Sequence, residues 1–152
     1  MEPLPKGVTG FEAPDSGVPV KRFTAACHSA AQQVRGHVEF VRAAAGHVTP
    51  NFHEASVSWN DGAGKARVLC NAHHPIVAFA SPVTGEGDTR IEFVDCPELA
   101  SAFDAGFHIL NHKEASAAIS PEALVQLSEA ELVQMRYWDP RTIGDLVFNF
   151  WD

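Results

Sequence analysis

Three of the eight histidines in this sequence are the residues best suited to chemistry: His53, His73 and His74. Imidazole is a common ligand of zinc and other divalent metals. If the three rings meet at one end of one sheet, they predict a divalent metal site, and a small metal-dependent hydrolase is then one hypothesis for the function. The neighbouring side chains that could add an oxygen ligand are Glu54, Asn51 and Asn71.

A predicted hairpin would bring these histidines together. Residues 53–59 and 65–72 both alternate between apolar and polar side chains, which is typical of half-buried strands. The Asp61-Gly62 pair between them is a strong signal for a tight turn. Pairing across that turn puts position 53 roughly opposite position 71, close to the two histidines that follow the second strand.

The alternative is that the three histidines are polar residues at strand ends that bond to the backbone. Their spacing matches no established zinc signature, such as two histidines four apart on a helix beside a glutamate. Adjacent side chains on a strand also point to opposite faces. Only a turn could therefore bring both His73 and His74 to one ion.

The sequence offers few nucleophiles. Cys27, Cys70 and Cys96 are odd in number and form no C-x-x-C pair, which argues against a disulfide framework or a thiolate zinc site. Cys70 lies near His73 in sequence, and such a pair can form an activated thiolate. The alternation of its strand instead places Cys70 on the buried face, where a cysteine is usually a small apolar residue. We therefore assign no catalytic residue and no organic cofactor.

Charge is distributed unevenly along the chain. The net charge is −8, and residues 86–152 hold thirteen acidic and four basic side chains. This argues against nucleic acid and anionic membrane as partners, since both require a basic face. An acidic surface that binds a basic protein is one interpretation, and a solvated face that keeps the protein soluble is the other. With no apolar leader at the start, the expected location is the cytoplasm.

The elements predicted around the histidines define an α+β fold with a single globular domain over residues 1–152. Residues 1–20 form an irregular arm rich in proline and glycine. Residues 21–45 form a long N-terminal helix, because apolar residues recur there at spacings of three and four, with Gly46 as its left-handed cap. The helix packs on a mainly antiparallel sheet of four to five strands. The remaining strands are an apolar central strand at Ile76–Ala80 and a fourth at Arg90–Val94.

Short helices and a closing strand follow. Pro97 opens one helix, Pro121 opens a helical turn, and Ser128-Glu129-Ala130-Glu131 fits the capping box of a third. Asp139-Pro140 ends that helix. Residues 143–151 are then expected to form a last strand that anchors the C-terminus in the core through Phe148, Phe150 and Trp151. Asn149, on this apolar segment, must find hydrogen-bond partners, as a structural amide or as a polar group in a binding pocket.

The ending resembles that of a family of small uncharacterised bacterial proteins. The shared pattern is Tyr137-Trp138-x-Pro140-x-x-x-Gly144-Asp145-x-x-Phe148-Asn149-x-Trp151-Asp152, with further similarity at Asn51-Phe52-His53-Glu54, Leu69-Cys70-Asn71-Ala72-His73 and Ala78-Phe79-Ala80. The similarity runs from about residue 4 to the end. It implies no activity, cofactor or catalytic residue. Proteins of this size and type are sometimes similar to immunity or antitoxin proteins, which bind and block a toxin.

Two hypotheses follow, in this order. The first is a non-enzymatic protein-binding module of immunity or inhibitor type, which uses the acidic second half against a basic partner. The second is the metal-dependent hydrolase with the histidine cluster. Formation of a homodimer through the C-terminal segment or a sheet edge is a further expectation about partners.

Overall fold

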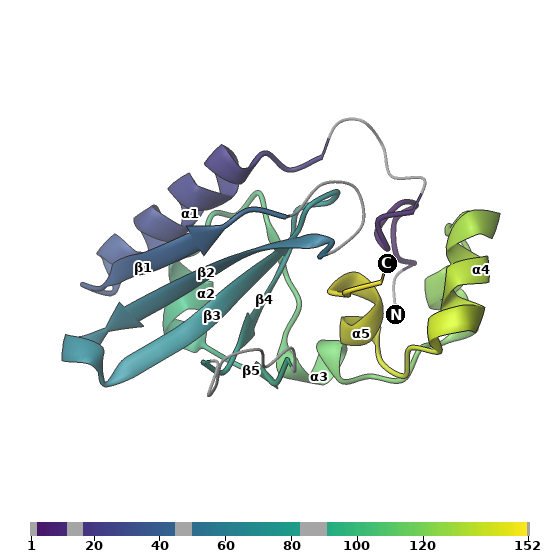
Figure 1. The fold of residues 1–152 in the computed structure, drawn as a ribbon. Coiled ribbons are helices and arrows are strands. Elements are labelled where there is room, and N and C mark those ends of the chain that lie inside the picture. Colours follow the sequence, from purple (N-terminus) through teal and green to yellow (C-terminus); the bar gives the residue numbers. More distant parts are fainter. Residues whose placement is uncertain (1–2, 12–16, 45–49, 83–90, 152) are drawn as a thin grey trace.

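The protein has an α+β fold in which helices cover a mostly antiparallel sheet (Figure 1). The computed structural model describes residues 3–11, 17–44, 50–82 and 91–151. The strands are β1 His37–Arg42, β2 Phe52–Trp59, β3 Gly64–Asn71, β4 Ile76–Ala80, β5 Phe93–Val94 and β6 His108–Ile109. The helices are α1 Val20–Gln33, α2 Pro97–Ala102, α3 His112–Ala115, α4 Glu129–Trp138 and α5 Ile143–Val147, with 3₁₀ turns η1 Asn60–Gly62 and η2 Pro121–Leu124.

Strands β1 to β5 follow one another across the sheet in sequence order, and β6 pairs with β4 in parallel. The predicted hairpin is confirmed: β2 and β3 pair antiparallel from Phe52↔Asn71 to Trp59↔Gly64. All three residues of its turn have positive φ, which the Asn60-Asp61-Gly62 sequence accommodates. The prediction of a central strand is also confirmed, because all five residues of β4 are buried. The predicted fourth strand is shorter than expected, and its first residue, Arg90, lies outside the described residues.

The N-terminal helix is shorter than predicted, and the prediction of one helix over residues 21–45 is wrong beyond Gln33. The chain leaves α1 through Arg35, which has a φ of 58°. The Arg35 N–H donates to the Gln32 carbonyl, and the Gly36 N–H donates to the Ala31 carbonyl at 2.8 Å. This Schellman pattern ends the helix. The predicted cap at Gly46 lies outside the described residues.

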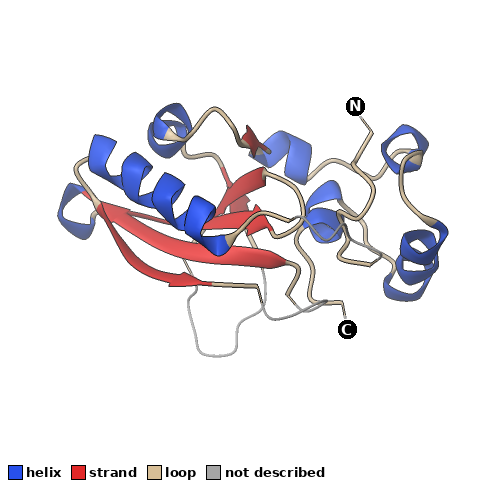
Figure 2. Cartoon of the chain, turned by 90° about the horizontal axis from the view of Figure 1, so that it is seen from above, coloured by secondary structure: helices blue, strands red, loops and turns tan. Residues whose placement is uncertain are grey.

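The helices lie on both sides of the sheet (Figure 2), and two clusters of buried apolar side chains join them to it. The first lies between one face of the sheet and α1 and α2, and Phe23, Val57 and Phe79 belong to it. The second joins the other face of the sheet to α5 and to residues 3–11, and Phe52, Leu69 and Leu146 belong to it. The N-terminal segment is thus part of the core, although it forms no helix or strand.

The predicted strand over residues 143–151 is wrong, because Ile143–Val147 is the helix α5. Thr142 caps it: the Thr142 hydroxyl accepts from the Asp145 N–H at 3.1 Å, and Asp145 accepts in return from the Thr142 N–H. The expected anchoring holds for Phe148 and Trp151, which are buried, whereas Phe150 is 37% exposed. The helices predicted at Pro97 and Ser128 and the turn at Pro121 are confirmed.

A substitution at Gly36 can test whether the chain packs closely in the turn between α1 and β1. A Cβ at this position would overlap the Ser58 carbonyl oxygen, which belongs to the backbone of β2 and cannot move aside. We expect Gly36→Ala to lower the free energy of unfolding by about 1–3 kcal/mol, measured by urea denaturation. Gly106→Ala is the matched control, because its new Cβ would meet only side-chain atoms within 3.4 Å. Equal stability of the two variants would contradict the close approach.

Candidate functional site

His53 is buried in β2 and fully engaged in hydrogen bonds. Its Nε2 lies 2.7 Å from the Val18 carbonyl oxygen, and its Nδ1 accepts from the Ala44 N–H at 2.9 Å. With Nδ1 as an acceptor, Nε2 is the ring nitrogen that can donate to the Val18 carbonyl oxygen. The ring also stacks on Phe23 at 5.9 Å between centroids. His53 pairs with Cys70, one residue away from the expected register.

His73 and His74 occupy the turn after β3. Their backbone N–H groups both donate to the Asn71 Oδ1, at 2.9 and 3.0 Å. The His74 Nε2 lies 2.7 Å from the Lys6 carbonyl oxygen. Burial lowers the pKa of His73 below its ordinary value, as do the neighbouring His74 and His53, against a smaller opposing effect of Glu131.

The predicted metal site needs a rearrangement of these contacts. Among the residues that the structure describes, no group of three or more His, Cys, Asp or Glu side chains is placed to hold a metal ion. His53 would have to give up a bond to Val18 or Ala44 before it could bind one. Of the oxygen candidates, Glu54 accepts from the buried Arg67 at 3.0 Å. The metal site stays a prediction.

The other two oxygen candidates, Asn51 and Asn71, belong with Asn149 to a buried group that we call the asparagine cluster. The Nδ2 atoms of Asn51 and Asn71 each donate to the carbonyl oxygens of Val8 and Val147, at 2.7–3.0 Å. The two amides thereby tie the ends of β2 and β3 to the N-terminal segment and to α5.

Asn149 completes the asparagine cluster from the C-terminal segment. Its backbone N–H donates to the Asn51 Oδ1 at 2.8 Å. Its Nδ2 donates to the carbonyl oxygens of Thr9 and Leu146, and its Oδ1 accepts from the Trp151 N–H. Asn149 is therefore a structural amide with its hydrogen-bonding groups satisfied, which was the first of the two interpretations.

Glu131 is a second buried polar group that sequence reasoning assigned only a capping role. Its side chain is fully buried and accepts four hydrogen bonds from neutral groups. The donors are the Gly7 N–H at 2.8 Å, the Thr9 N–H at 3.1 Å, the Thr9 hydroxyl at 2.6 Å and the Ser128 N–H at 3.0 Å. One carboxylate thus caps α4 and holds residues 3–11 in place.

The cysteines are placed as structural residues. Burial raises the pKa of Cys27 to about 12 and the pKa of Cys70 further still. Only the thiolate is a good nucleophile, so both thiols are unreactive at neutral pH. Burial also raises the pKa of Cys96.

The surface feature that stands out is an apolar face on α4. We call it the α4 face and define it as Val133, Tyr137 and Trp138, which are 46%, 77% and 39% exposed. The rings of Tyr137 and Trp138 meet edge to face at 5.1 Å. The indole N–H donates to the Gln134 Oε1 at 3.2 Å. Sequence reasoning grouped these two rings with the C-terminal segment, although Val133 and Tyr137 are four apart and share a helical face.

Exposed carboxylates outnumber exposed cations in the chain on either side of the α4 face. Between residues 121 and 139 the exposed charges are Glu122, Glu129 and Asp139 against Arg136. Arg136 is itself 3.5 Å from Glu129. The exposed charge of this stretch of the chain is therefore mainly acidic, in line with the charge of the second half of the chain.

Comparisons with protein-family models, with curated proteins and with solved structures found no match. The resemblance of the ending to small bacterial proteins stays a prediction. No helix among the described residues combines the length and the apolar character that crossing a membrane requires.

The asparagine cluster can be tested at Asn71. Asn71→Ala leaves the His73 and His74 N–H groups without their acceptor, and we expect a loss of about 2–4 kcal/mol in the free energy of unfolding. Asn71→Asp keeps the acceptor but sets a carboxylate against two carbonyl oxygens, and we expect it to be destabilising as well. The control, Gln126→Ala, removes an exposed amide. A loss in Asn71→Ala no greater than in the control would show that the cluster is dispensable.

His73 makes stability depend on pH. Its folded-state pKa lies below 6.5, so below that pH the unfolded chain binds more protons than the folded one. Stability that is present above about pH 6.5 is therefore lost as the pH falls. We expect His73→Gln to narrow the difference in unfolding free energy between pH 7.5 and pH 5.5, measured with urea. Gln126→Ala, which removes an exposed side chain that does not titrate, should leave it unchanged, and an unchanged difference in His73→Gln would refute the assignment.

Proposed function

We propose that the protein is a cytoplasmic, non-enzymatic binding module of immunity or inhibitor type that docks a basic protein on the α4 face. The observation that carries the proposal is the 77% exposure of Tyr137 beside Trp138, on a helix whose opposite side is anchored in the core. Large apolar side chains gathered on a surface are typical of interaction sites.

The types of side chain on the α4 face suit an anchor for a partner. Tyrosine and tryptophan are enriched among the interface residues that dominate binding energy. The edge-to-face contact of Tyr137 with Trp138 and the indole hydrogen bond to Gln134 restrict both rings. Less side-chain entropy is lost on binding when the anchors are already ordered.

The exposed charges near the α4 face indicate that the partner is positively charged. Glu129 on α4, Asp139 directly after it and Glu122 before it are exposed carboxylates close in sequence to the apolar side chains and would form a polar rim for a bound partner. A partner with lysines or arginines around an apolar groove would complement this rim and would be steered towards it. The occupant that fits is therefore a basic protein surface that accepts one exposed helix, a common mode of recognition.

A variant that keeps the fold but alters the α4 face tests the proposal. We expect the wild-type protein, used as bait at low salt, to retain a basic protein from lysate of its source cells. The purified partner should then bind in a calorimetric titration, with an affinity that falls as salt rises. Val133→Ser/Tyr137→Ser should weaken that binding at least about tenfold, since each large anchor contributes more than 1 kcal/mol.

Phe40→Ser is the matched control, because Phe40 is 44% exposed but lies on β1. It should bind the purified partner as the wild type does. The proposal fails if no basic protein is retained. It also fails if the α4 variant and the control bind that partner equally.

A further inference from the structure

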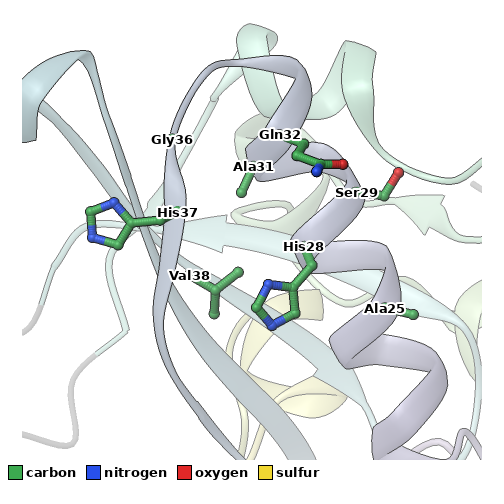
Figure 3. A pocket seen from close by; sticks show the side chains of 8 residues that line it. All are labelled: Ala25, His28, Ser29, Ala31, Gln32, Gly36, His37 and Val38. Carbon is green, nitrogen blue, oxygen red and sulfur yellow. The ribbon is translucent and has the colours of Figure 1, made fainter.

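A groove runs between α1 and the strand β1. Its volume is about 410 Å³, and Ala25, His28, Gln32 and Val38 contribute to its walls. Figure 3 shows the His28 ring beside Val38, between the helix and the strand, whereas the His37 ring points to the other side of β1. The His37 Nε2 lies 3.2 Å from the Ser58 hydroxyl, so this ring is engaged away from the groove.

The groove lies along an edge of the sheet. Within the described ranges, β1 pairs with β2 and with no other strand. The four side chains His37, Glu39, Phe40 and Arg42 are exposed. The outer edge of such a strand presents backbone N–H and C=O groups that can pair with another chain. An irregularity of register between Val38 and Phe40, typical of a β-bulge, interrupts the regular ladder.

The segment that forms the groove is basic, in contrast to the acidic second half of the chain, although the described residues that line the groove itself include no lysine or arginine. Residues 17–44 contain Lys21, Arg22, Arg35 and Arg42 against one carboxylate, Glu39. That carboxylate already pairs with Lys65 at 3.2 Å. Lys21, His28 and Gln32 are spaced by seven and four residues, so they form one exposed stripe along α1. A ligand along this stripe would meet the hydrogen-bonding groups of His28 and Gln32 and, beyond the groove, the positive charge of Lys21.

We propose that this groove binds an extended peptide segment that carries carboxylates. The segment adds to the outer edge of β1 as a further strand, and its backbone pairs with the N–H and C=O groups of β1 that point away from β2. Alternate side chains of a strand point to the same face. Acidic side chains at alternate positions would therefore line up along the stripe of Lys21, His28 and Gln32, on the α1 side of the sheet.

A second copy of the chain fits this edge less well. Two copies of β1 that pair antiparallel are related by a two-fold axis perpendicular to the sheet. Both α1 helices then lie on the same face of the joined sheet, and their stripes face each other across the joint. Because the stripes then run antiparallel, Lys21 of each copy lies towards the Gln32 end of the other stripe and meets no carboxylate of that stripe, whereas an acidic segment is attracted to Lys21.

Nuclear magnetic resonance of the ¹⁵N-labelled protein tests the proposal with a blocked octapeptide of alternating threonine and glutamate. We expect this peptide to shift the amide signals of β1 and to slow hydrogen exchange there. The octapeptide of alternating threonine and lysine should do neither. The affinity of the acidic peptide should fall as sodium chloride is added.

Two double variants with the same change of charge distinguish binding at the groove from attraction to the net charge of the protein. Lys21→Glu/His28→Glu should weaken binding at least about tenfold, a loss of about 1.4 kcal/mol or more. His112→Glu/Lys113→Glu changes an exposed lysine and histidine on α3 and should bind nearly as the wild type does. Unchanged amide spectra away from the substitutions establish that both variants are folded.

The proposal is overturned by any of three results. The acidic peptide leaves β1 unperturbed, both peptides bind alike, or the two double variants lose affinity equally. A dimer of the free protein, seen by light scattering, whose β1 amides are protected would assign the edge to a second copy and would also overturn it. None of these results bears on the α4 face, because the two surfaces lie at opposite ends of the molecule (Figure 1).

Discussion

The fold depends on buried amide and carboxylate groups that join segments distant in sequence. Asn149 and Thr9 are 140 residues apart, and Glu131 and Gly7 are 124 apart, yet each pair shares a buried hydrogen bond. Every such group loses its hydration on burial and is costly unless its bonds are made. Because the donors and acceptors come from the N-terminal segment, the strand ends, α4 and α5 at once, the loss of one member leaves several others unsatisfied. These segments are therefore expected to unfold together.

This constraint also bears on the chemistry that the sequence first suggests. Asparagine and histidine side chains at strand ends could either bind a metal ion or form hydrogen bonds that join neighbouring segments. The contacts distinguish the two: Asn71 uses both ends of its amide on backbone groups, and His53 uses both ring nitrogens. Polar residues at this end of the sheet thus hold the backbone of neighbouring segments, and the exposed large apolar side chains include those on α4 and Phe40 on β1.

Sequence patterns predicted the secondary structure correctly where a local pattern was compatible with one element. They failed where the same local pattern was compatible with both a helix and a strand. The β2–β3 hairpin and the start of α4 follow from alternation, an Asp-Gly turn and a capping box. Val34, Val38 and Val41 recur at helical spacing, but an irregularity of register between Val38 and Phe40 gives the same spacing to a strand. In the C-terminal segment, Thr142 and Asp145 carry the capping signal that also marks α4, but the apolar run after them favoured a strand. The asparagine cluster could not be foreseen, because the partners of Asn149 are set by tertiary structure.

Different contacts fix the two proposed binding surfaces in place before a partner binds. The α4 helix is short, and isolated helices of its length are not stable in water. Its first turn is fixed by Ser128 and by the Glu131 carboxylate, which the N-terminal segment surrounds with donors. The helix is thus held from one side, and its other side remains open to a partner. At β1 the backbone conformation sets the position of the binding surface. Arg35 is in the left-handed conformation and Gly36 packs against Ser58, so the chain turns directly from α1 into the strand. The groove and the sheet edge therefore arise from the same tight turn, and a residue larger than glycine at position 36 would disturb both.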